Sequence, residues 1–344
     1  MSAIQTRKLA IGYIPSKKTP QVIASGLDLS LAPGELVCLL GPNGIGKSTL
    51  MRTISGMQPA LGGHVNLDGR QVEDLPAKER ARRIGIVLTE RIDVGHLSSY
   101  ALVSLGRYPY TDWTGRMDAE DHRIVTEAIN AVGASDLADR SVSELSDGER
   151  QKIMIARVLA QETEVILLDE PTAFLDLPRR VEIIALLRGL AHESGKAILL
   201  STHDLDLAVR NADRIWLMTS GNVETGIPES LVLNGAFETA FAREGIEFDQ
   251  SSGSFRPLHR PGLRIRFSES GLVAAWTTRA LERIGYAVVT EGSDIELSLE
   301  LEEDDGKTIW TLRSEDALSF PTLDALVAHL KVKFTSTLAG RDSS

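Results

Sequence analysis

Residues 41–48, with the sequence Gly-Pro-Asn-Gly-Ile-Gly-Lys-Ser, constrain the fold of this chain more than any other segment. They follow an apolar run, Leu36–Leu40, that predicts a strand, and they precede an amphipathic segment, residues 49–56, that predicts a helix. A glycine-rich loop that joins a strand to a helix and ends in Lys-Ser is the P-loop pattern. We therefore predict an α/β fold that binds phosphate at the carboxyl end of this strand.

The residue types in this loop suit the triphosphate of ATP. Its glycines let successive backbone N–H groups point at phosphate oxygens, and the N-terminus of the following helix adds partial positive charge. Lys47 would reach the β- and γ-phosphates, and the hydroxyl of Ser48 can ligate Mg²⁺. ATP and Mg²⁺ are therefore the expected cofactors. The candidate nucleotide-binding residues of this segment are Gly41, Pro42, Asn43, Gly44, Ile45, Gly46, Lys47, Ser48 and Thr49.

A second apolar run, residues 165–168, ends in two carboxylates, Asp169 and Glu170. The carboxyl end of a strand is where an α/β sheet presents its catalytic groups. Asp169 would hold Mg²⁺ directly or through water. Glu170 would accept a proton from, or orient, the water that attacks the γ-phosphate.

Between residues 36 and 213, short apolar runs alternate with longer amphipathic segments, which is typical of parallel strands linked by crossover helices. Residues 92–160 instead show helical periodicity and no convincing strand, and we interpret them as an inserted helical subdomain. The expected strands are residues 36–40, 165–168 and 197–200, and the expected helices are residues 49–56, 118–132, 148–159, 180–193 and 205–211.

The end of the chain predicts a second, smaller domain. Residue 249 opens a polar run of small residues without periodicity, which is typical of a linker. Further on, alternating apolar residues, a predicted hairpin turn at Asp305-Gly306 and two helical segments indicate a β-α-β-β-β-α unit. We therefore expect a large domain over residues 1–248, a linker over residues 249–262 and a small α+β domain over residues 263–338.

The small domain carries no pattern that assigns it a chemistry. Its acidic residues 302–305 lie at the predicted hairpin turn, where solvation explains their charge better than a metal site does. Trp276, Tyr286 and Trp310 are more typical of a core than of ligand contacts. A structural or dimerising role is the favoured interpretation, and a regulatory ligand-binding module is the alternative.

Composition excludes several classes of protein. The 344 residues are 42% hydrophobic and 25% charged, as in an ordinary globular protein. A formal net charge of -11 leaves no overall basic face for nucleic acid or for an anionic membrane surface. The amino terminus lacks a signal-peptide pattern, and no apolar run approaches the roughly 20 residues that span a bilayer. The single cysteine, Cys38, lies in an apolar run and is expected to be a buried thiol, which suits a reducing cytoplasm.

Further short motifs occur in the order found in ABC ATPases, and the chain resembles that family over roughly residues 7–226. The resemblance implies the P-loop NTPase fold of an ABC cassette, with a mixed-sheet core and the helical subdomain, and it implies ATPase activity. The matching segments are residues 145–149 (Leu-Ser-Asp-Gly-Glu), similar to the signature motif; residues 174–176 (Phe-Leu-Asp), similar to the D-loop; His203 in Thr-His-Asp, similar to the switch histidine; and Tyr13, where the family stacks an aromatic ring on adenine.

The resemblance also implies a mechanism. Two cassettes would pack head to tail as a homodimer, with ATP between the P-loop of one subunit and the signature motif of the other. Ser146 and the amide of Gly148 would contact the γ-phosphate across the interface. His203 would hold the attacking geometry together with Glu170, and Asp176 would cross the interface.

Two segments depart from the family pattern. The family usually has glutamine at the end of the strand after the P-loop helix, where this chain has Thr89 and then Glu90. Thr89 is the better match and would ligate Mg²⁺ or water, and Glu90 is the alternative. The signature motif has Asp147 for glycine and Glu149 for glutamine, and acids in the first turn of a helix are favoured by the helix dipole.

Residues 102–110 and Arg179 resemble the ATPases of importers for iron-siderophore complexes, haem and cobalamin. This implies a translocase subunit that works with membrane permease subunits and, indirectly, with a substrate-binding protein, as a peripheral protein at the cytoplasmic face of the inner membrane. The alternatives are an ABC transporter with another substrate, and an ABC ATPase that acts on ribosomes or DNA without a permease. A single P-loop and the lack of sustained heptads favour the transporter.

Overall fold

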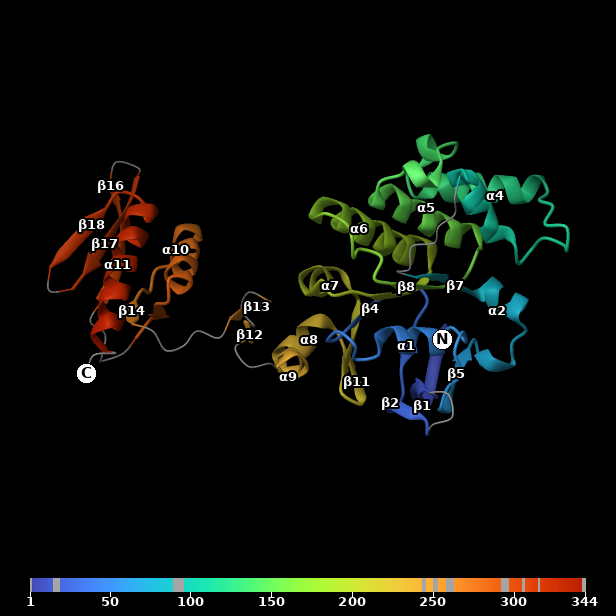
Figure 1. Ribbon diagram of the computed structural model, residues 1–344, viewed down its shortest axis with the longest axis horizontal. Helices are drawn as coiled ribbons and strands as arrows, with labels where there is room; N and C mark the ends of the chain where they lie inside the picture. Colours follow the sequence, from blue (N-terminus) through green and yellow to red (C-terminus); the bar gives the residue numbers. More distant parts are fainter. Residues whose placement is uncertain are drawn as a thin grey trace. The chain divides into compact units, whose positions relative to one another are not determined.

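The computed structural model describes residues 2–14, 19–88, 96–242, 246–249, 253–257, 263–291, 297–304, 307–314 and 316–341 (Figure 1). For residues 246, 247, 254–257, 304 and 334–341 it describes the backbone alone. The chain divides into a larger unit, Met1–Ala242 with Phe248–Phe255, and a smaller unit, Arg243–Glu247 with Arg256–Ser344.

The larger unit is built on a six-stranded sheet in which only the edge strand β11 runs antiparallel to its neighbour. Every residue of β4, β9 and β8 is buried. Parallel strands covered on both faces need apolar residues at most positions, which is why short apolar runs in the sequence predicted them. In sheet order the strands are β11 (Asn222–Gly226), β10 (Arg214–Thr219), β4 (Leu36–Leu40), β9 (Ala197–Ser201), β8 (Val165–Asp169) and β7 (Ile84–Val87).

Two hydrophobic cores lie on the two faces of this sheet, because successive side chains of a strand point to opposite faces. On β4, Cys38 belongs to one core and its neighbour Leu39 belongs to the other. The helices α5 (Asp147–Ala160) and α6 (Leu177–Ser194) pack into the core of Cys38, whereas α1 (Lys47–Ile54) packs into the core of Leu39 (Figure 1). The predicted α/β fold is confirmed. The larger unit also contains α2 (Ala77–Arg83), α7 (Leu205–Asn211), α8 (Pro228–Leu233) and α9 (Ala236–Phe241).

An antiparallel sheet covers the face of the central sheet on which α1 lies (Figure 1). The sequence analysis located none of its strands. The register of the long strand β1 shifts between Leu9 and Ile11 against one neighbour and between Arg7 and Ala10 against the other, and such irregularities interrupt the alternation that reveals a strand. In sheet order the strands are β2 (Gln21–Leu27), β1 (Ile4–Tyr13), β5 (Gly62–Leu67) and β6 (Arg70–Gln71), with β3 (Ser30–Leu31) paired to β1.

The helical subdomain contains α3 (Ser99–Ser104), α4 (Ala119–Ala131) and α5, which pack against one another. The two longer helices lie within one residue of their expected bounds. Both begin at capping boxes, formed at Asp118 and Ser146, in which side chains satisfy the first free N–H groups of the helix. Within the described residues 96–160, the only strand-like pairing is an isolated bridge between Ser98 and Ser141.

The smaller unit has a five-stranded sheet and the helices α10 (Leu272–Arg283) and α11 (Leu323–Arg341). Along the chain, this unit has one strand more than the expected β-α-β-β-β-α sequence of elements, namely β18 (Ala317–Phe320). That strand is short and mostly exposed, so it lacks the alternation that would have revealed it. In sheet order the strands are β15 (Ala287–Val289), β14 (Arg264–Arg266), β16 (Leu297–Asp304), β17 (Lys307–Arg313) and β18 (Ala317–Phe320).

Aromatic residues of the smaller unit divide between core and surface. Tyr286 and Trp310 are buried, and their polar atoms donate hydrogen bonds to the carbonyl of Leu330 and the hydroxyl of Thr277. The core expectation is wrong for Trp276, which is 56% exposed and lies 5.0 Å from the guanidinium carbon of Arg279. The predicted turn at residues 305–306 lies outside the described residues.

In the range expected to be a linker, β13 (Ser254–Pro257) pairs with β12 (Ile246–Asp249), of which all but Asp249 precedes that range. Residues 250–252 and 258–262 lie outside the described part of the chain, so the domain boundaries stay a prediction. Cys38 is buried, as expected, and burial raises the pKa of its thiol to about 12. Among the described helices, none has both the length and the apolar character needed to cross a bilayer.

Candidate active site

Two glycines of the P-loop adopt left-handed backbone conformations in tight surroundings, with φ of 151° at Gly41 and 115° at Gly46. A Cβ atom on Gly41 would lie 2.5 Å from the carbonyl oxygen of Met218, and one on Gly46 would lie 2.5 Å from Cγ2 of Ile23. Only glycine fits at both positions. The loop is thus held against two neighbouring strands, which fixes its backbone.

Lys47 begins α1, and its buried ammonium group donates hydrogen bonds to the carbonyls of Gly41 (2.9 Å) and Pro42 (3.3 Å). Burial lowers the pKa of Lys47, while the charges of Glu170 and Asp169 act in the opposite direction. The lysine therefore lies within electrostatic reach of both carboxylates. This follows from the sheet order, in which only β9 separates β4 from β8.

The two carboxylates differ in environment. Asp169 is buried at the end of β8 and accepts a hydrogen bond from the hydroxyl of Ser201 at 2.6 Å. Glu170 is partly exposed and has a φ of 49°, in the left-handed region where non-glycine residues are uncommon. Such backbone outliers cluster at functional sites, because the surrounding structure must hold them there.

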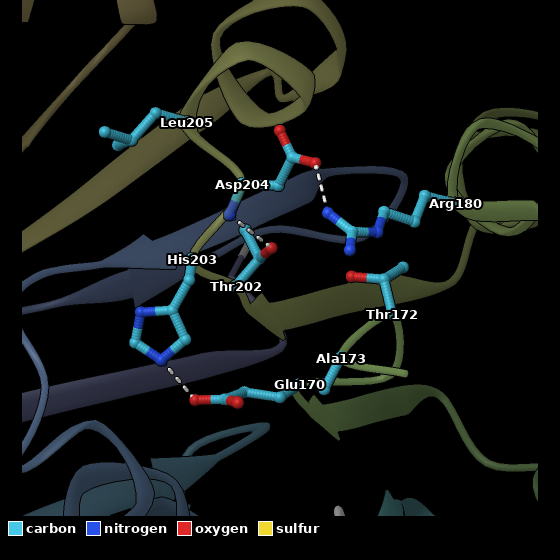
Figure 2. Close-up of a pocket in the computed structure, with 8 residues that line it drawn as sticks. All are labelled: Glu170, Thr172, Ala173, Arg180, Thr202, His203, Asp204 and Leu205. Atoms are coloured by element: carbon cyan, nitrogen blue, oxygen red, sulfur yellow. Dashed lines mark hydrogen bonds and ion pairs between the residues drawn. The ribbon is translucent and has the colours of Figure 1, made fainter. Parts of the chain in front are cut away.

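His203 and Glu170 meet across the site. The Nε2 atom of His203 lies 2.5 Å from Oε1 of Glu170, as Figure 2 shows. A carboxylate offers only acceptors, so the imidazole donates this hydrogen bond. The structure thus brings together Glu170 of the carboxylate pair and His203, which the sequence analysis selected separately.

A pocket of about 470 Å³ opens beside this pair (Figure 2). Its lining includes Arg180, a residue that the sequence analysis did not select. The guanidinium donates to the carbonyl of Leu175 (2.8 Å) and to Oδ2 of Asp204 (3.3 Å). It therefore ties the D-loop to the loop of His203. The lining residues are Glu170, Thr172, Ala173, Arg180, Thr202, His203, Asp204 and Leu205.

Ser201 is a second residue that sequence reasoning missed. Its hydroxyl donates to Asp169, as noted above, and accepts the backbone N–H of Glu170 at 3.0 Å. A sequence signal existed: Ser201 ends the apolar run before His203, and the ends of neighbouring parallel strands lie at one edge of a sheet.

The signature motif forms the first turn of α5. Ser146 is the N-cap residue, and its hydroxyl and backbone N–H both donate to Oε2 of Glu149, at 2.7 and 2.8 Å. These hydrogen bonds hold the pKa of Glu149 below its usual range. Arg140 lies 3.2 Å from the other oxygen of this carboxylate. Glu149, which replaces the usual glutamine of the signature motif, is thus accommodated by a helix cap and an ion pair.

The D-loop has an exposed apolar surface. Asp176 is the N-cap of α6 and accepts the backbone N–H of Arg179 at 3.0 Å. On either side of it, Phe174 is 64% exposed and Leu177 is 65% exposed. Neighbouring exposed apolar side chains of this size are typical of an interaction surface.

Of the remaining predicted site residues, Tyr13 is described by the structure and Thr89 is not. Tyr13 ends β1 and is 46% exposed, so its ring is accessible for stacking. Thr89 and Glu90 lie outside the described residues, and the assignment of Thr89 stays a prediction.

The residues present fit a magnesium ion held mainly by nucleotide. Asp169 offers a carboxylate and Ser48 a hydroxyl, and oxygen ligands of this kind are those that Mg²⁺ uses together with substrate phosphates and water. In the part of the chain that the structure describes, no group of three or more His, Cys, Asp or Glu side chains forms a metal cluster.

The P-loop, the carboxylate pair and the histidine lie at one edge of the central sheet, whereas the signature helix belongs to the opposite core and to an inserted helical subdomain. This combination defines an ATP-binding cassette. Residues 24–173 match the ABC transporter family, and residues 262–331 match the iron ABC transporter C-terminal domain. The chain belongs to the family of ABC transporter ATP-binding proteins, which binds and hydrolyses ATP.

Curated relatives match between about two thirds and three quarters of this chain. An uncharacterized ABC transporter ATP-binding protein of Methanocaldococcus jannaschii is 39% identical over 75% of this chain and 88% of its own length. The ferric enterobactin transport ATP-binding protein of Escherichia coli is 39% identical over 67% of this chain and 84% of its own. The iron(3+)-hydroxamate import ATP-binding protein of Bacillus subtilis is 37% identical over 65% and 81%.

Solved structures agree with the fold. A dimeric structure of a bacterial ABC transporter cassette superimposes with a TM-score of 0.57 and 28% identity, over 65% of this chain and 98% of that chain. The same cassette has been solved as a dimer in a post-hydrolysis state bound to ADP and Pi. The likeness covers about two thirds of this chain and nearly the whole of that cassette.

Proposed function

We propose that this chain is the ATP-hydrolysing subunit of an importer and that it energises uptake of an iron complex, such as a ferric siderophore, through a separate membrane permease. The match of residues 262–331 to the iron ABC transporter C-terminal domain carries the choice of substrate class. The relatives named for ferric enterobactin and iron(3+)-hydroxamate support the same choice.

In the proposed reaction Glu170 accepts a proton from, or orients, the water that attacks the γ-phosphate. A base must lie within hydrogen-bond reach of the proton that it removes. The hydrogen bond from His203 restricts the side chain of Glu170, and the left-handed backbone fixes where that side chain starts. Lys47 offsets charge on the β- and γ-phosphates, which is the main task of a protein in phosphoryl transfer.

Magnesium, when bound, would neutralise phosphate charge and orient the nucleotide. Ser48 and Asp169 are the residues proposed to hold it, with Thr89 as a further ligand. Glycines of the P-loop and Thr49 would present backbone N–H groups to the phosphates. Tyr13 would stack on the adenine ring.

The working form is proposed to be a homodimer. The exposed apolar residues Phe174 and Leu177 beside Asp176 support an interface at the D-loop. The signature residues Ser146 and Gly148 would then contact the γ-phosphate in the partner subunit. Since α5 and α1 pack into cores on opposite faces of the sheet, a contact across subunits is easier to build than one within a subunit.

The proposed location is the cytoplasmic face of the membrane, reached through the permease, with a substrate-binding protein as the indirect partner. An uptake assay tests this. The gene for the chain is deleted, and uptake of ferric siderophore, haem and cobalamin is measured in cells supplied with the wild-type chain or with Glu170→Gln. The proposal expects restoration of iron-complex uptake by the wild-type chain alone.

Three other outcomes would contradict it in distinct ways. Loss of cobalamin uptake alone would keep the importer and change its substrate. Unchanged uptake of all three compounds, with ATPase activity intact, would favour a different transporter. Co-purification of the chain with ribosomes or DNA rather than with a permease would favour the ABC ATPases that act without a membrane partner.

A further inference from the structure

The serine that ends β9 connects three elements of the active site. Ser201 is fully buried, and its position is set by pairing on both sides: it lies opposite Leu39 of β4 and opposite Asp169 of β8. The first neighbour strand leads into the P-loop, and the second ends in the carboxylate pair. Two residues after Ser201 comes His203.

The Ser201 hydroxyl uses both its donor and its acceptor capacity within the site. It donates to Oδ1 of Asp169 at 2.6 Å and accepts the N–H of Glu170 at 3.0 Å. The carbonyl of Ser201 lies 3.2 Å from the same N–H. A hydroxyl has one hydrogen and two lone pairs, so this arrangement is fully consistent.

These contacts act on two parts of the site, the carboxylate of Asp169 and the backbone of Glu170. Because Oδ1 of Asp169 accepts the hydroxyl hydrogen of Ser201, the rotation of this carboxylate is restricted. At Glu170, the hydroxyl and carbonyl of Ser201 hold the N–H of a residue whose left-handed backbone is unfavourable for an L-amino acid with a Cβ atom.

We propose that Ser201 is a positioning residue for ATP hydrolysis, which orients the Asp169 carboxylate toward Mg²⁺ and fixes the Glu170 backbone so that its side chain meets His203. It acts through these residues and touches neither nucleotide nor metal. The proposal rests on the proposed roles of Asp169 and Glu170.

The test compares Ser201→Ala, which removes the hydroxyl, with Ser201→Thr, which keeps it, and with Ser201→Cys, which keeps the size and weakens the donor. The control is Thr6→Val. Thr6 is buried in β1 and its hydroxyl also bridges two groups, the carbonyl of Leu27 and the N–H of Leu29, both at 2.8 Å. This control loses a comparable bridge away from the carboxylates.

Three kinds of measurement are made for each variant: steady-state kinetics (kcat and KM for ATP with Mg²⁺), ATP affinity with and without Mg²⁺, and the thermal unfolding midpoint. In Ser201→Ala we expect kcat to fall by about 10- to 100-fold, the range of one hydrogen bond to a charged group. The gain in ATP affinity on adding Mg²⁺ should shrink by about 10-fold, whereas affinity without Mg²⁺ stays unchanged. Thr or Cys at position 201 should restore part of both.

Thr6→Val should lower the unfolding midpoint and leave the kinetics and the ATP affinities unchanged. If Ser201→Ala behaves like Thr6→Val, the serine is structural and the proposal is overturned. Loss of ATP affinity without Mg²⁺ would overturn it as well, since the hydroxyl would then be supporting the P-loop. Two other results would overturn the proposed function on which this inference rests: a wild-type chain that hydrolyses no ATP, or a Glu170→Gln variant that keeps full activity. Either result would reject Glu170 as the base, and it can be told apart from a structural role of Ser201.

Discussion

The Nε2 atom of His203 lies 2.5 Å from Oε1 of Glu170, although 33 residues separate the two in the chain. β8 and β9 are adjacent parallel strands, so the residues that follow them emerge at the same edge of the sheet. This hydrogen bond restricts the side chain of Glu170, the candidate base. A phosphate-binding fold with a base held in this way is a candidate hydrolase.

Glu170→Gln should lower ATP hydrolysis by about 10²- to 10⁴-fold, the usual contribution of a positioned general base. The amide keeps the shape of the side chain but cannot accept a proton. ATP binding should persist, and an ATP-bound dimer should accumulate, as measured by size-exclusion chromatography with ATP and Mg²⁺. Glu193→Gln, an exposed position on α6, is the control and should match the wild type. Wild-type turnover in Glu170→Gln would exclude this residue as the base.

Glu149→Gln should strengthen ATP-dependent dimerisation. The single hydrogen of the Ser146 hydroxyl is donated to Glu149, so it must leave this carboxylate before it can be donated to a phosphate. A neutral amide accepts it less strongly, by about 1 kcal/mol, which corresponds to about 5-fold in affinity. Analytical ultracentrifugation with ATP measures the dimer constant. Weaker dimerisation in the variant, at an unchanged unfolding midpoint, would show that Glu149 assists the contact.

Arg180→Met should reduce kcat by about 3- to 30-fold with little change in ATP affinity, since the two hydrogen bonds that link Leu175 to Asp204 are lost while the P-loop is untouched. Met keeps the apolar stem of the side chain. Arg188→Met, farther along α6, serves as the comparison. Equal rates in the two variants would mean that the D-loop and the histidine loop need no link through Arg180.

Arg107→Met should destabilise the larger unit by about 3–5 kcal/mol, because it leaves a buried carboxylate without its partner. Arg107 and Asp121 are both buried, and Nε of Arg107 donates to Oδ1 of Asp121 at 2.8 Å. Urea unfolding followed at pH 7 measures the loss. The exposed pair of Arg210 with Asp206 is the comparison, and Arg210→Met should cost less than about 1 kcal/mol.

The same pair predicts an acid dependence. Burial raises the pKa of Asp121, but the hydrogen bond from Arg107 and the other groups around it outweigh burial and hold the pKa below its usual range. The ion pair therefore contributes stability above the unfolded-state pKa of about 3.9, and this contribution is lost as the pH falls through the lower folded-state pKa. Asp121→Asn should show a smaller loss of stability between pH 4 and 2 than the wild type does, because the variant has no carboxylate to protonate at this position. If the stability of Asp121→Asn and of the wild type fell equally between pH 4 and 2, groups other than Asp121 would cause the acid sensitivity.

The sequence by itself determined the central strands, the P-loop and most of the candidate catalytic residues. Buried parallel strands leave apolar runs, and a phosphate loop needs glycines and a lysine at fixed spacing, so both are readable in one dimension. The ends of β8 and β9 could likewise be expected to meet. Local periodicity also located α4 and α5 within one residue.

Only the tertiary structure decided how polar groups are shared. Ser201 bridges Asp169 and Glu170, and Arg180 bridges Leu175 and Asp204, through side-chain directions that sequence spacing does not contain. The strand β1 escaped detection because its register shifts interrupt alternation, and Trp276 proved exposed because its helix packs through another face. Hydrogen bonds depend on atomic positions set by packing across the whole fold, whereas strands and loops depend mainly on residues close in the chain.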